Sequence, residues 1–232
     1  MKYSEFESII SPERLRKYIV ACGGNTTKAM TLYRYNLRLS QEMFVVVSCF
    51  EVALRNRIDA IMKAYWGDDW LRDLILPGGA FYCDKRTENT KKIIEKEYHN
   101  LVKHKDYSHT KLLSKVGFGV WKYMFSNIQY FLTGQVLLKV FPNKPKSSKV
   151  NRYDNSYVFG ELDYITNFRN RIAHHEPICF GTTKCIDTSY VKDRYLRIMT
   201  LFDWMGIDAV SLLYGLGHVV QAIKKIEKLL DV

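Results

Sequence analysis

One stretch of the chain, residues 25–67, constrains the fold more than any other. Apolar residues in its second half recur at spacings of three and four, which is the pattern of an amphipathic helix. These positions are Val45, Cys49, Val52, Leu54, Ile58 and Ile61. The stretch predicts one long helix, or two helices if Ser40 caps a second segment, and Gly67 is expected to end it.

The segments on either side also predict helices, and strand signals are scarce. The pair Ser11–Pro12 is typical of a helix start, and Gly23–Gly24 is typical of a helix end. The charged segment 84–105 has only a narrow apolar stripe, which predicts a helix solvated on most sides. The aromatic segment 117–142 predicts buried helix on both sides of Gly134.

The C-terminal half follows the same pattern. The basic and polar segment 143–152 predicts a loop. A helix over 153–176 must end before Pro177, because proline does not continue a helix, and further helices are expected over 186–206 and 207–230. We therefore expect an all-α domain of about seven to nine helices.

Composition narrows the class of protein. The chain has 232 residues, 47% of them hydrophobic. That is enough for a large core, and no Gly/Ser/Pro-rich linker divides the chain, so a single domain over 1–232 is expected. The 35 Lys and Arg exceed the 24 Asp and Glu by 11, a surplus that favours a polyanionic partner. Charge alone does not distinguish RNA, DNA and an anionic membrane surface.

The cysteines and the N-terminal segment indicate a compartment. The five cysteines are odd in number and scattered, and most sit in apolar surroundings, where a reduced thiol acts as a small core residue. Residues 1–18 contain no apolar core of signal-peptide length. No uncharged apolar run is long enough to span a membrane. We therefore expect a soluble protein of the reducing cytoplasm.

The tetrapeptide Arg-Asn-Arg-Ile occurs twice in the chain. The copies are Arg55–Ile58 and Arg169–Ile172, and only the second runs into two adjacent histidines, His174 and His175. The flanks of the two copies share little else, so we infer no internal duplication.

The second copy gathers several groups that can do chemistry. On a helix, Asn170 and His174 share a face, and so do Arg171 and His175. Arg169 and His174 lie about 140° apart on an ideal helix, so they converge only if the arginine bends round or the helix loosens before its end. The plainer interpretation is a solvated basic helix end, where His and Arg interact favourably with the helix dipole.

These residue types suit the cleavage of RNA. A histidine can take a proton from a ribose 2′-OH or give one to a leaving 5′-oxygen at neutral pH. An adjacent arginine offers a rigid fork to the scissile phosphate and to the charge that develops on it. Attack by the substrate's own 2′-OH needs no metal, and the chain has no acidic cluster at metal-ligand spacing.

The residues RNRIAHHEPI, 169–178, resemble the R-x(4–6)-H motif of the HEPN superfamily, in the Arg-Asn-x-x-Ala-His-His form of Abi-like (abortive infection) proteins. Three further blocks resemble the same family in the same order, namely residues 11–43, 49–71 and 117–142. The resemblance is clearest over residues 10–178.

The resemblance implies an all-α HEPN-type helical bundle with additional helices. It also implies a homodimer in which the motif residues of two chains meet in one cleft. The expected activity is that of a metal-independent, cofactor-free endoribonuclease of a toxin or antiphage defence system, with RNA as substrate. In this assignment Arg169 is the motif arginine, Asn170 the polar residue after it and His174 the motif histidine, while His175 also satisfies the permitted spacing.

The chain departs from the family pattern at one position that bears on its partners, and it offers further residues that could support the motif. A tyrosine two residues after the histidine, found in toxins modified by a nucleotidyltransferase antitoxin, is absent, and Glu176 and Pro177 stand there. Such a partner is therefore not expected, and another antitoxin or defence protein remains a candidate. Near the first copy, Glu51 and Arg55 form an intrahelical ion pair, or else Glu51, Arg55 and Asn56 form a polar triplet that supports the motif helix. Glu176 is a further candidate for a supporting residue.

Other patterns in the sequence are explained without a functional site. His99, His104 and His109 fall at five-residue steps, and Cys179 and Cys185 match no zinc pattern, so no metal site is expected. The Lys- and Arg-rich clusters are solvated faces, or phosphate tracks if the partner is a polyanion. The alternatives to an endoribonuclease are a non-catalytic HEPN module that binds RNA or a protein, and a HEPN domain that senses a nucleotide.

Overall fold

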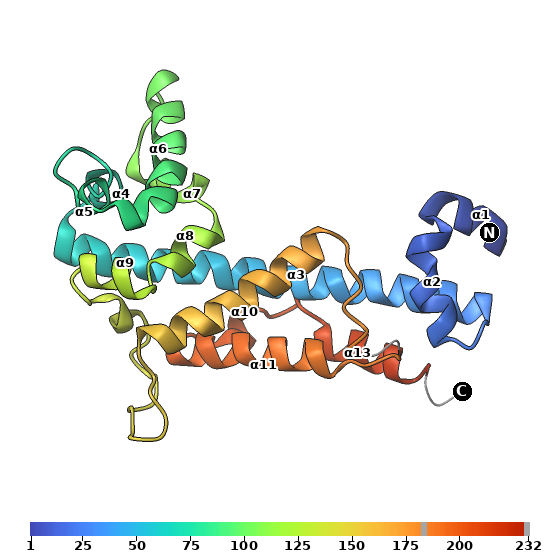
Figure 1. Ribbon diagram of the computed structural model, residues 1–232. Coiled ribbons are helices and arrows are strands. Elements are labelled where there is room, and N and C mark those ends of the chain that lie inside the picture. The colour runs from blue at the N-terminus through green and yellow to red at the C-terminus, as the bar shows by residue number, and fades with distance from the viewer. Residues whose placement is uncertain (182–184, 230–232) are drawn as a thin grey trace. The chain divides into compact units, whose positions relative to one another are not determined.

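The protein is built almost entirely from helices. The computed structural model describes residues 1–181 and 185–229, and 69% of the chain is helical. The α-helices of the described part are α1 (Tyr3–Ile10), α2 (Pro12–Ala21), α3 (Thr26–Trp66), α4 (Trp70–Asp73), α5 (Ala80–Cys83), α6 (Glu88–Lys103), α7 (His109–Lys115), α8 (Phe118–Tyr123), α9 (Asn127–Leu132), α10 (Asn155–Ala173), α11 (Ser189–Trp204), α12 (Ala209–Leu212) and α13 (Val219–Glu227). Two 3-10 helices, η1 (Lys85–Thr87) and η2 (Leu137–Val140), accompany them (Figure 1).

The all-α prediction is confirmed. Among the described residues, β pairing is limited to one isolated bridge between Phe180 and Ile186. The described residues form 13 α-helices, more than the seven to nine expected. The helices α4, α5 and α12 have four residues and α8 and α9 have six, and helices this short leave little trace in an apolar pattern. No helix in the described residues has the length and apolar character needed to cross a membrane.

The chain divides into two compact units. Unit 1 comprises residues 1–49, 167–200 and 209–232, and unit 2 comprises residues 50–166 and 201–208. The division falls inside α3, α10 and α11, so each of these helices contributes residues to both units.

The stretch 25–67 forms one unbroken helix, α3, and Ser40 lies within it rather than at a cap. Gly67 ends the helix in a left-handed conformation with φ 89°, which glycine adopts without steric cost. Of the apolar positions expected to form the buried stripe of α3, Leu54 and Ile58 are buried, Val45, Cys49 and Ile61 are half-buried, and Val52 is 45% exposed. The stripe consists of Leu32, Leu39, Met43, Val46, Val47, Phe50, Leu54, Ile58 and Met62.

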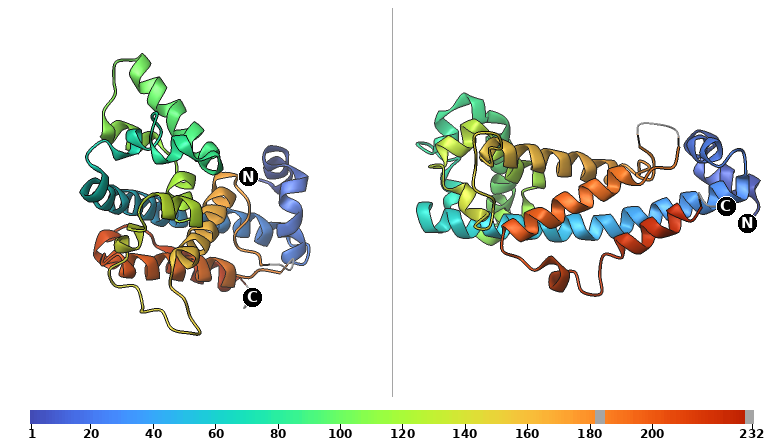
Figure 2. Two further views of the ribbon diagram at one scale, coloured as in Figure 1. Left: turned by 60° about the vertical axis from the view of Figure 1, so that its left-hand side comes forward. Right: turned by 90° about the horizontal axis from the view of Figure 1, so that it is seen from below.

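Unit 1 packs α1, α2 and α13 against the first half of α3. Aromatic rings join the N-terminal helices to α3: Tyr33 meets Phe6 edge to face at 5.5 Å and Tyr18 at 5.2 Å between ring centroids. On α13, Val219, Ile223 and Ile226 are buried, and Figure 2 shows this helix lying alongside α3.

The predicted start and end of α2 are both confirmed. The helix begins at Pro12, where the Ser11 side chain accepts a hydrogen bond from Arg14 N at 3.4 Å, and it ends just before Gly23–Gly24. Serine at the N-cap satisfies one of the backbone donors that a helix start leaves without partners.

Unit 2 contains the aromatic segment, and here the prediction is confirmed only in part. Two buried helices were expected around Gly134, but the segment forms the short helices α8 and α9 and the 3-10 helix η2. Gly117 and Ser126 each begin a new helix, and Ser126 accepts from Gln129 N at 3.5 Å as a cap. The resulting breaks leave Phe131 67% exposed.

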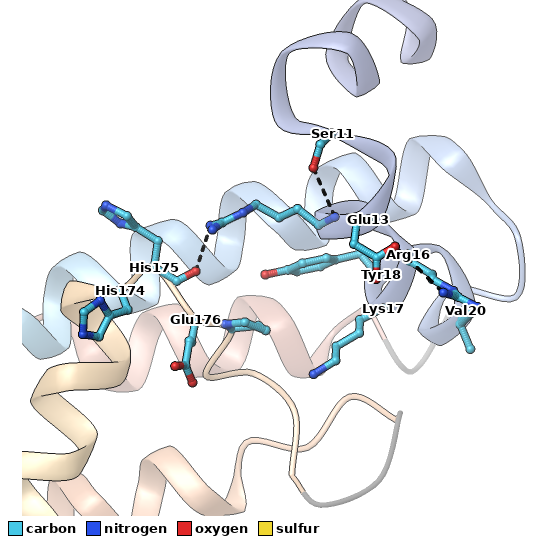
Figure 3. A pocket seen from close by; sticks show the side chains of 11 residues that line it. Ser11, Glu13, Arg16, Lys17, Tyr18, Val20, His174, His175 and Glu176 are labelled. Atoms are coloured by element: carbon cyan, nitrogen blue, oxygen red, sulfur yellow. Dashed lines mark hydrogen bonds and ion pairs between the residues drawn. The ribbon is translucent and has the colours of Figure 1, made fainter.

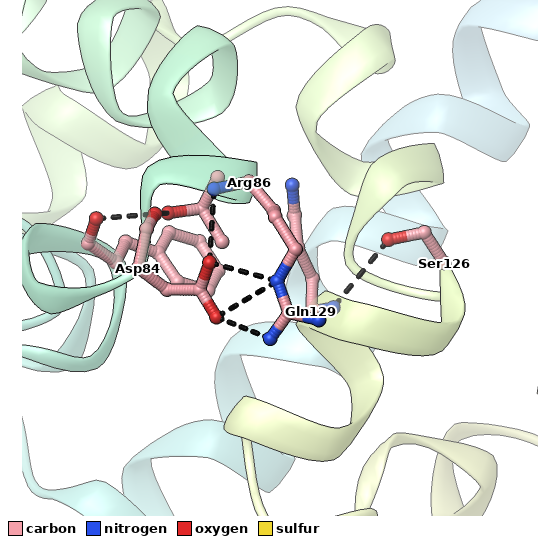
Figure 4. A network of polar contacts seen from close by, with 6 residues as sticks. Asp84, Arg86, Ser126 and Gln129 are labelled. Atoms are coloured by element: carbon pink, nitrogen blue, oxygen red, sulfur yellow. Dashed lines mark hydrogen bonds and ion pairs between the residues drawn. The ribbon is translucent and has the colours of Figure 1, made fainter.

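Two polar networks hold the turns of unit 2. In the first, Asp84 accepts from Arg86 Nη2 at 2.6 Å and from Arg86 N at 2.9 Å, and these bonds lower the pKa of Asp84 to about 2 (Figure 4). In the second, Asp59 accepts from Trp70 Nε1 at 2.8 Å and lies 2.6 Å from His109 Nε2. The segment 143–152 is a loop, as its composition predicts.

Candidate functional site

The helix that carries the candidate motif, α10, ends at Ala173 because Pro177 lies close ahead. The last turn closes with the two bonds of a Schellman motif, His175 N–H to Ile172 O at 3.0 Å and Glu176 N–H to Arg171 O at 2.9 Å. His175 takes the left-handed conformation that this motif requires, with φ 56°. Glycine usually holds that position, and another residue there costs roughly 1 kcal/mol.

The Schellman turn changes one expected geometry. Arg171 and His175 were expected to share a helix face, but the left-handed backbone at His175 takes its side chain out of helical register. Arg171 instead donates its Nη2 to Pro177 O at 2.8 Å, pairs with Glu176 at 3.2 Å, and lies over the Tyr190 ring at 4.7 Å. Arg171 and Glu176 thus brace the turn.

The other motif residues are free of such bonds. Asn170, His174 and His175 are exposed and Arg169 is half-buried. In the part of the chain that the structure describes, none of their four side chains makes a hydrogen bond or an ion pair with another residue. Their donors and acceptors therefore remain open to a ligand.

Helix α6 of unit 2 ends in the same way and offers a comparison. Lys105 is left-handed with φ 53°, and His104 precedes it just as His174 precedes His175. The ring of His104 lies 2.8 Å from Asn100 O and so helps to cap its own helix. The ring of His174 makes no such bond with the described residues, so its position is not explained by capping.

The two histidines line a pocket of about 650 Å³. Helix α2 supplies the opposite wall, and Arg14 Nη1 donates to His175 O at 3.0 Å, which ties α2 to the end of α10. Figure 3 shows the two imidazole rings at one end of the pocket and Lys17 with Arg16 at the other. We call this hollow the α2 pocket; it is lined by Glu13, Arg14, Arg16, Lys17, Tyr18 and Val20 of α2, by Ser11, and by residues 174–177.

The α2 pocket carries a surplus of positive charge. Glu13 lies 3.9 Å from Arg16, and Glu176 is paired with Arg171 outside the pocket lining. Lys17 makes no hydrogen bond or ion pair with the described residues. The pocket is therefore suited to an anionic ligand.

The segment after the motif is fixed to the core of unit 1. Asn36 of α3 accepts hydrogen bonds from Ile178 N at 2.9 Å and from Cys179 N at 3.1 Å. Phe180 meets the Tyr18 ring edge to face at 5.2 Å. Burial raises the pKa of Cys179 to about 12, so this thiol is a core group. Residues 174–177, which we call the motif turn, are thus held between the end of α10 and the buried hydrogen bonds that Ile178 and Cys179 donate to Asn36.

The first copy of the tetrapeptide belongs to unit 2. Arg55 Nε donates to Asn56 Oδ1 at 3.4 Å on the surface of α3. The pairing of Glu51 with Arg55 and the support of the motif helix by these residues stay predictions.

Metal-ligand chemistry has no candidate among residues 1–181 and 185–229, where no group of three or more His, Cys, Asp or Glu side chains is arranged to hold an ion. The five cysteines are free thiols; Cys83 and Cys185 are exposed, and Cys22 and Cys179 are buried.

Sequence reasoning missed the contribution of α2. The segment Arg14–Tyr18 carries three cations and a tyrosine in five residues, and this density was the available signal. The sequence predicts only a capped helix over this segment, because nothing in a single sequence shows that α2 packs beside residues 174–177.

A family model described as Abi-like protein matches residues 3–179. No curated protein and no solved structure matches the chain. The matched residues include α1–α10, the motif turn and every residue that lines the α2 pocket.

Proposed function

Because the chain belongs to the family of Abi-like proteins, we propose that it acts in abortive infection as a metal-independent endoribonuclease of the HEPN superfamily. The family description itself points to abortive infection, a defence against phage. The step from the family to RNA cleavage rests on the chemistry of residues 169–175.

In the proposed reaction a histidine, His174 or His175, takes the proton from a ribose 2′-OH. The 2′-oxygen attacks the adjacent phosphorus, the bond from phosphorus to the 5′-oxygen breaks, and a second proton donor protonates that oxygen. The products are a 2′,3′-cyclic phosphate and a 5′-hydroxyl. Arg169 binds the phosphate and stabilises the charge that develops on it, and Asn170 orients it.

The observation that carries this proposal is the freedom of the motif side chains. Asn170, His174 and His175 are exposed and make no side-chain bonds within the described residues, and His175 holds a backbone conformation that histidine adopts at a cost. Residues held in strained conformations cluster at functional sites, and side chains without protein partners are available to a substrate. The +11 charge of the chain agrees with an RNA substrate.

A homodimer would complete the site. Arg169 and His174 lie on different sides of an ideal helix, and Arg169 is not among the residues that line the α2 pocket. Two copies of α10 set side by side would bring Arg169 of one chain to His174 of the other. We therefore propose a composite cleft that contains one motif from each protomer.

Purified protein incubated with total RNA and a tRNA pool in EDTA tests the activity. The wild type should yield fragments that end in 2′,3′-cyclic phosphate, and His174→Ala and Arg169→Ala should not. The matched control is His104→Ala, which removes a histidine from the equivalent position of α6. Its activity should equal that of the wild type.

Mixing His174→Ala with Arg169→Ala tests the composite cleft. If one dimer needs one residue from each chain, mixed dimers regain one intact cleft and part of the activity. RNA that is bound in a salt-sensitive manner but left intact by the wild type would contradict the enzyme and support a binding module.

A further inference from the structure

The face of α2 that meets the motif turn has a definite chemical character. Leu15 and Tyr18 are buried against the core of unit 1, and Arg14 and Lys17 lie one position before each of them. Residues three apart on a helix share a face. Arg14 and Lys17 therefore form a basic row along the edge of the α2 pocket, where both are lining residues.

Arg14 has binding capacity beyond its structural bond. Its Nη1 donates to His175 O at 3.0 Å, and a guanidinium has five N–H donors. The bond holds the arginine in place at the pocket, which reduces the entropy that a ligand contact would cost. Lys17 is exposed and has no partner among the described residues.

Tyr18 adds a neutral donor to this wall. The residue is 2% exposed, and its ring is held edge to face by Tyr33 and Phe180, both at 5.2 Å. The hydroxyl makes no hydrogen bond with the described residues, and Figure 3 shows it directed toward the end of the pocket where His175 lies. Burial raises the pKa of Tyr18, so the hydroxyl stays protonated and can donate.

We propose that the α2 pocket holds the nucleotide next to the scissile phosphate of a single-stranded RNA. Lys17 and Arg14 bind the phosphate of that nucleotide, and the Tyr18 hydroxyl donates to its sugar or base. Val20 and Pro177 provide an apolar wall. The volume of about 650 Å³ lies in the range that ligand pockets occupy. This inference rests on the proposed function, since it makes the pocket a subsite of the RNA-cleaving centre.

Binding of a short single-stranded RNA with 2′-O-methyl sugars, which has no free 2′-OH to attack the phosphate, isolates the subsite from the chemistry. Lys17→Gln should weaken binding about tenfold, as expected for loss of a charged hydrogen bond. It should also reduce the slope of log K against log salt by about 0.7, the value for one phosphate contact on a single strand. Tyr18→Phe keeps the ring and removes one neutral donor, and should weaken binding about two- to tenfold.

The control is Lys225→Gln on α13, which removes the same charge from an exposed position outside the pocket. It should leave both affinity and salt slope unchanged. Equal thermal unfolding of Tyr18→Phe and wild type checks that the core is intact, and Lys17 is exposed, so its variant tests the subsite in any case.

Cleavage of natural RNA by the same variants separates the two proposals. If the wild type cleaves RNA and neither Lys17→Gln nor Tyr18→Phe alters binding or cleavage, the subsite is refuted and the endoribonuclease stands. If the wild type does not cleave, but Lys17→Gln lowers affinity and salt slope and Lys225→Gln does not, the pocket binds RNA and the enzymatic proposal fails. An effect of Lys225→Gln equal to that of Lys17→Gln would mean that the overall positive charge of the chain, and not the α2 pocket, determines RNA binding. That result would overturn the inference.

Discussion

The anchor beneath the motif turn yields the most demanding prediction. Asn36 is 2% exposed, and its Oδ1 accepts from the backbone N–H groups of Ile178 and Cys179 at 2.9 and 3.1 Å. Both donors are buried. The substitution Asn36→Leu keeps a similar volume but removes the acceptor, so two backbone N–H groups lose their partner without gaining contact with water.

The size of the effect follows from those two bonds. A buried donor left without a partner costs about 1–3 kcal/mol, so the variant should lose about 2–6 kcal/mol of unfolding free energy. In a chain of this size 1 kcal/mol shifts the melting temperature by about 2–4 °C. The melting temperature should therefore fall by roughly 4–24 °C. RNA cleavage should fall with it, because the turn that carries His174 and His175 loses its support.

Urea unfolding followed by circular dichroism gives the free energy, and hydrogen exchange gives the location. The amides of Ile178 and Cys179 should lose protection in Asn36→Leu before the rest of unit 1. The control Asn36→Asp retains oxygens that can accept both bonds, so its loss should be smaller at neutral pH. A change below about 0.5 kcal/mol in Asn36→Leu, or unchanged protection of the two amides, would refute the reasoning.

Three further changes have clear expected results. His175→Gly should raise the melting temperature by about 2–4 °C, because glycine relieves roughly 1 kcal/mol of strain from the left-handed backbone. Calorimetry measures the shift, and a lower melting temperature in the variant would contradict the prediction. Burial alone would raise the pKa of Asp59, but hydrogen bonds from Lys63, Trp70 and His109 outweigh it and lower that pKa. The stabilisation is therefore present at neutral pH and lost as pH falls below about 4, so denaturant titrations should find the gap between wild type and Asp59→Asn narrowing there. A Cβ on Gly79 would meet Asp73 O at 2.1 Å, so Gly79→Ala should cost about 1–3 kcal/mol or more in urea unfolding, while Gly117→Ala, with nothing within 4 Å, should change little.

The sequence predicted those helix ends that a single residue type determines. Pro12, Gly67 and Pro177 act on the backbone at their own positions, and the helices begin or end where these residues require. The long helix α3 was open to prediction for the same reason, because nothing in its sequence breaks it.

The aromatic segment 117–142 shows where such reasoning fails. Its apolar density suggested a buried helix on each side of Gly134, whereas the cap at Ser126 divides the part before Gly134 into the two short helices α8 and α9. Serine and glycine also occur inside helices, so a cap is certain only when the chain around it turns. Tertiary packing decided between the two readings, as it often does for short helices.

The candidate site was also predictable only in part. His174 and His175 could be chosen from their residue types, but their geometry could not, because helical spacing ceases to apply at the left-handed backbone of His175. Arg14, Lys17 and Tyr18 are about 160 residues away in the chain and reach the pocket only through the packing of α2.

The two Schellman turns explain why the motif alone was ambiguous. Asn100 and His104 on α6 have the same spacing as Asn170 and His174 on α10, and each pair precedes a left-handed residue. Asparagine, histidine and a left-handed turn can therefore be nothing more than a way to end a helix, and at His104 the ring serves that purpose through Asn100 O. At His174 the same backbone is built without that ring contact, beside a basic wall from another helix. We expect His104→Ala to lower stability without changing RNA cleavage, and His174→Ala to abolish cleavage without changing stability. That result would mean that the absence of a ring hydrogen bond, rather than the residue types of the motif, distinguishes a catalytic helix end from a structural one.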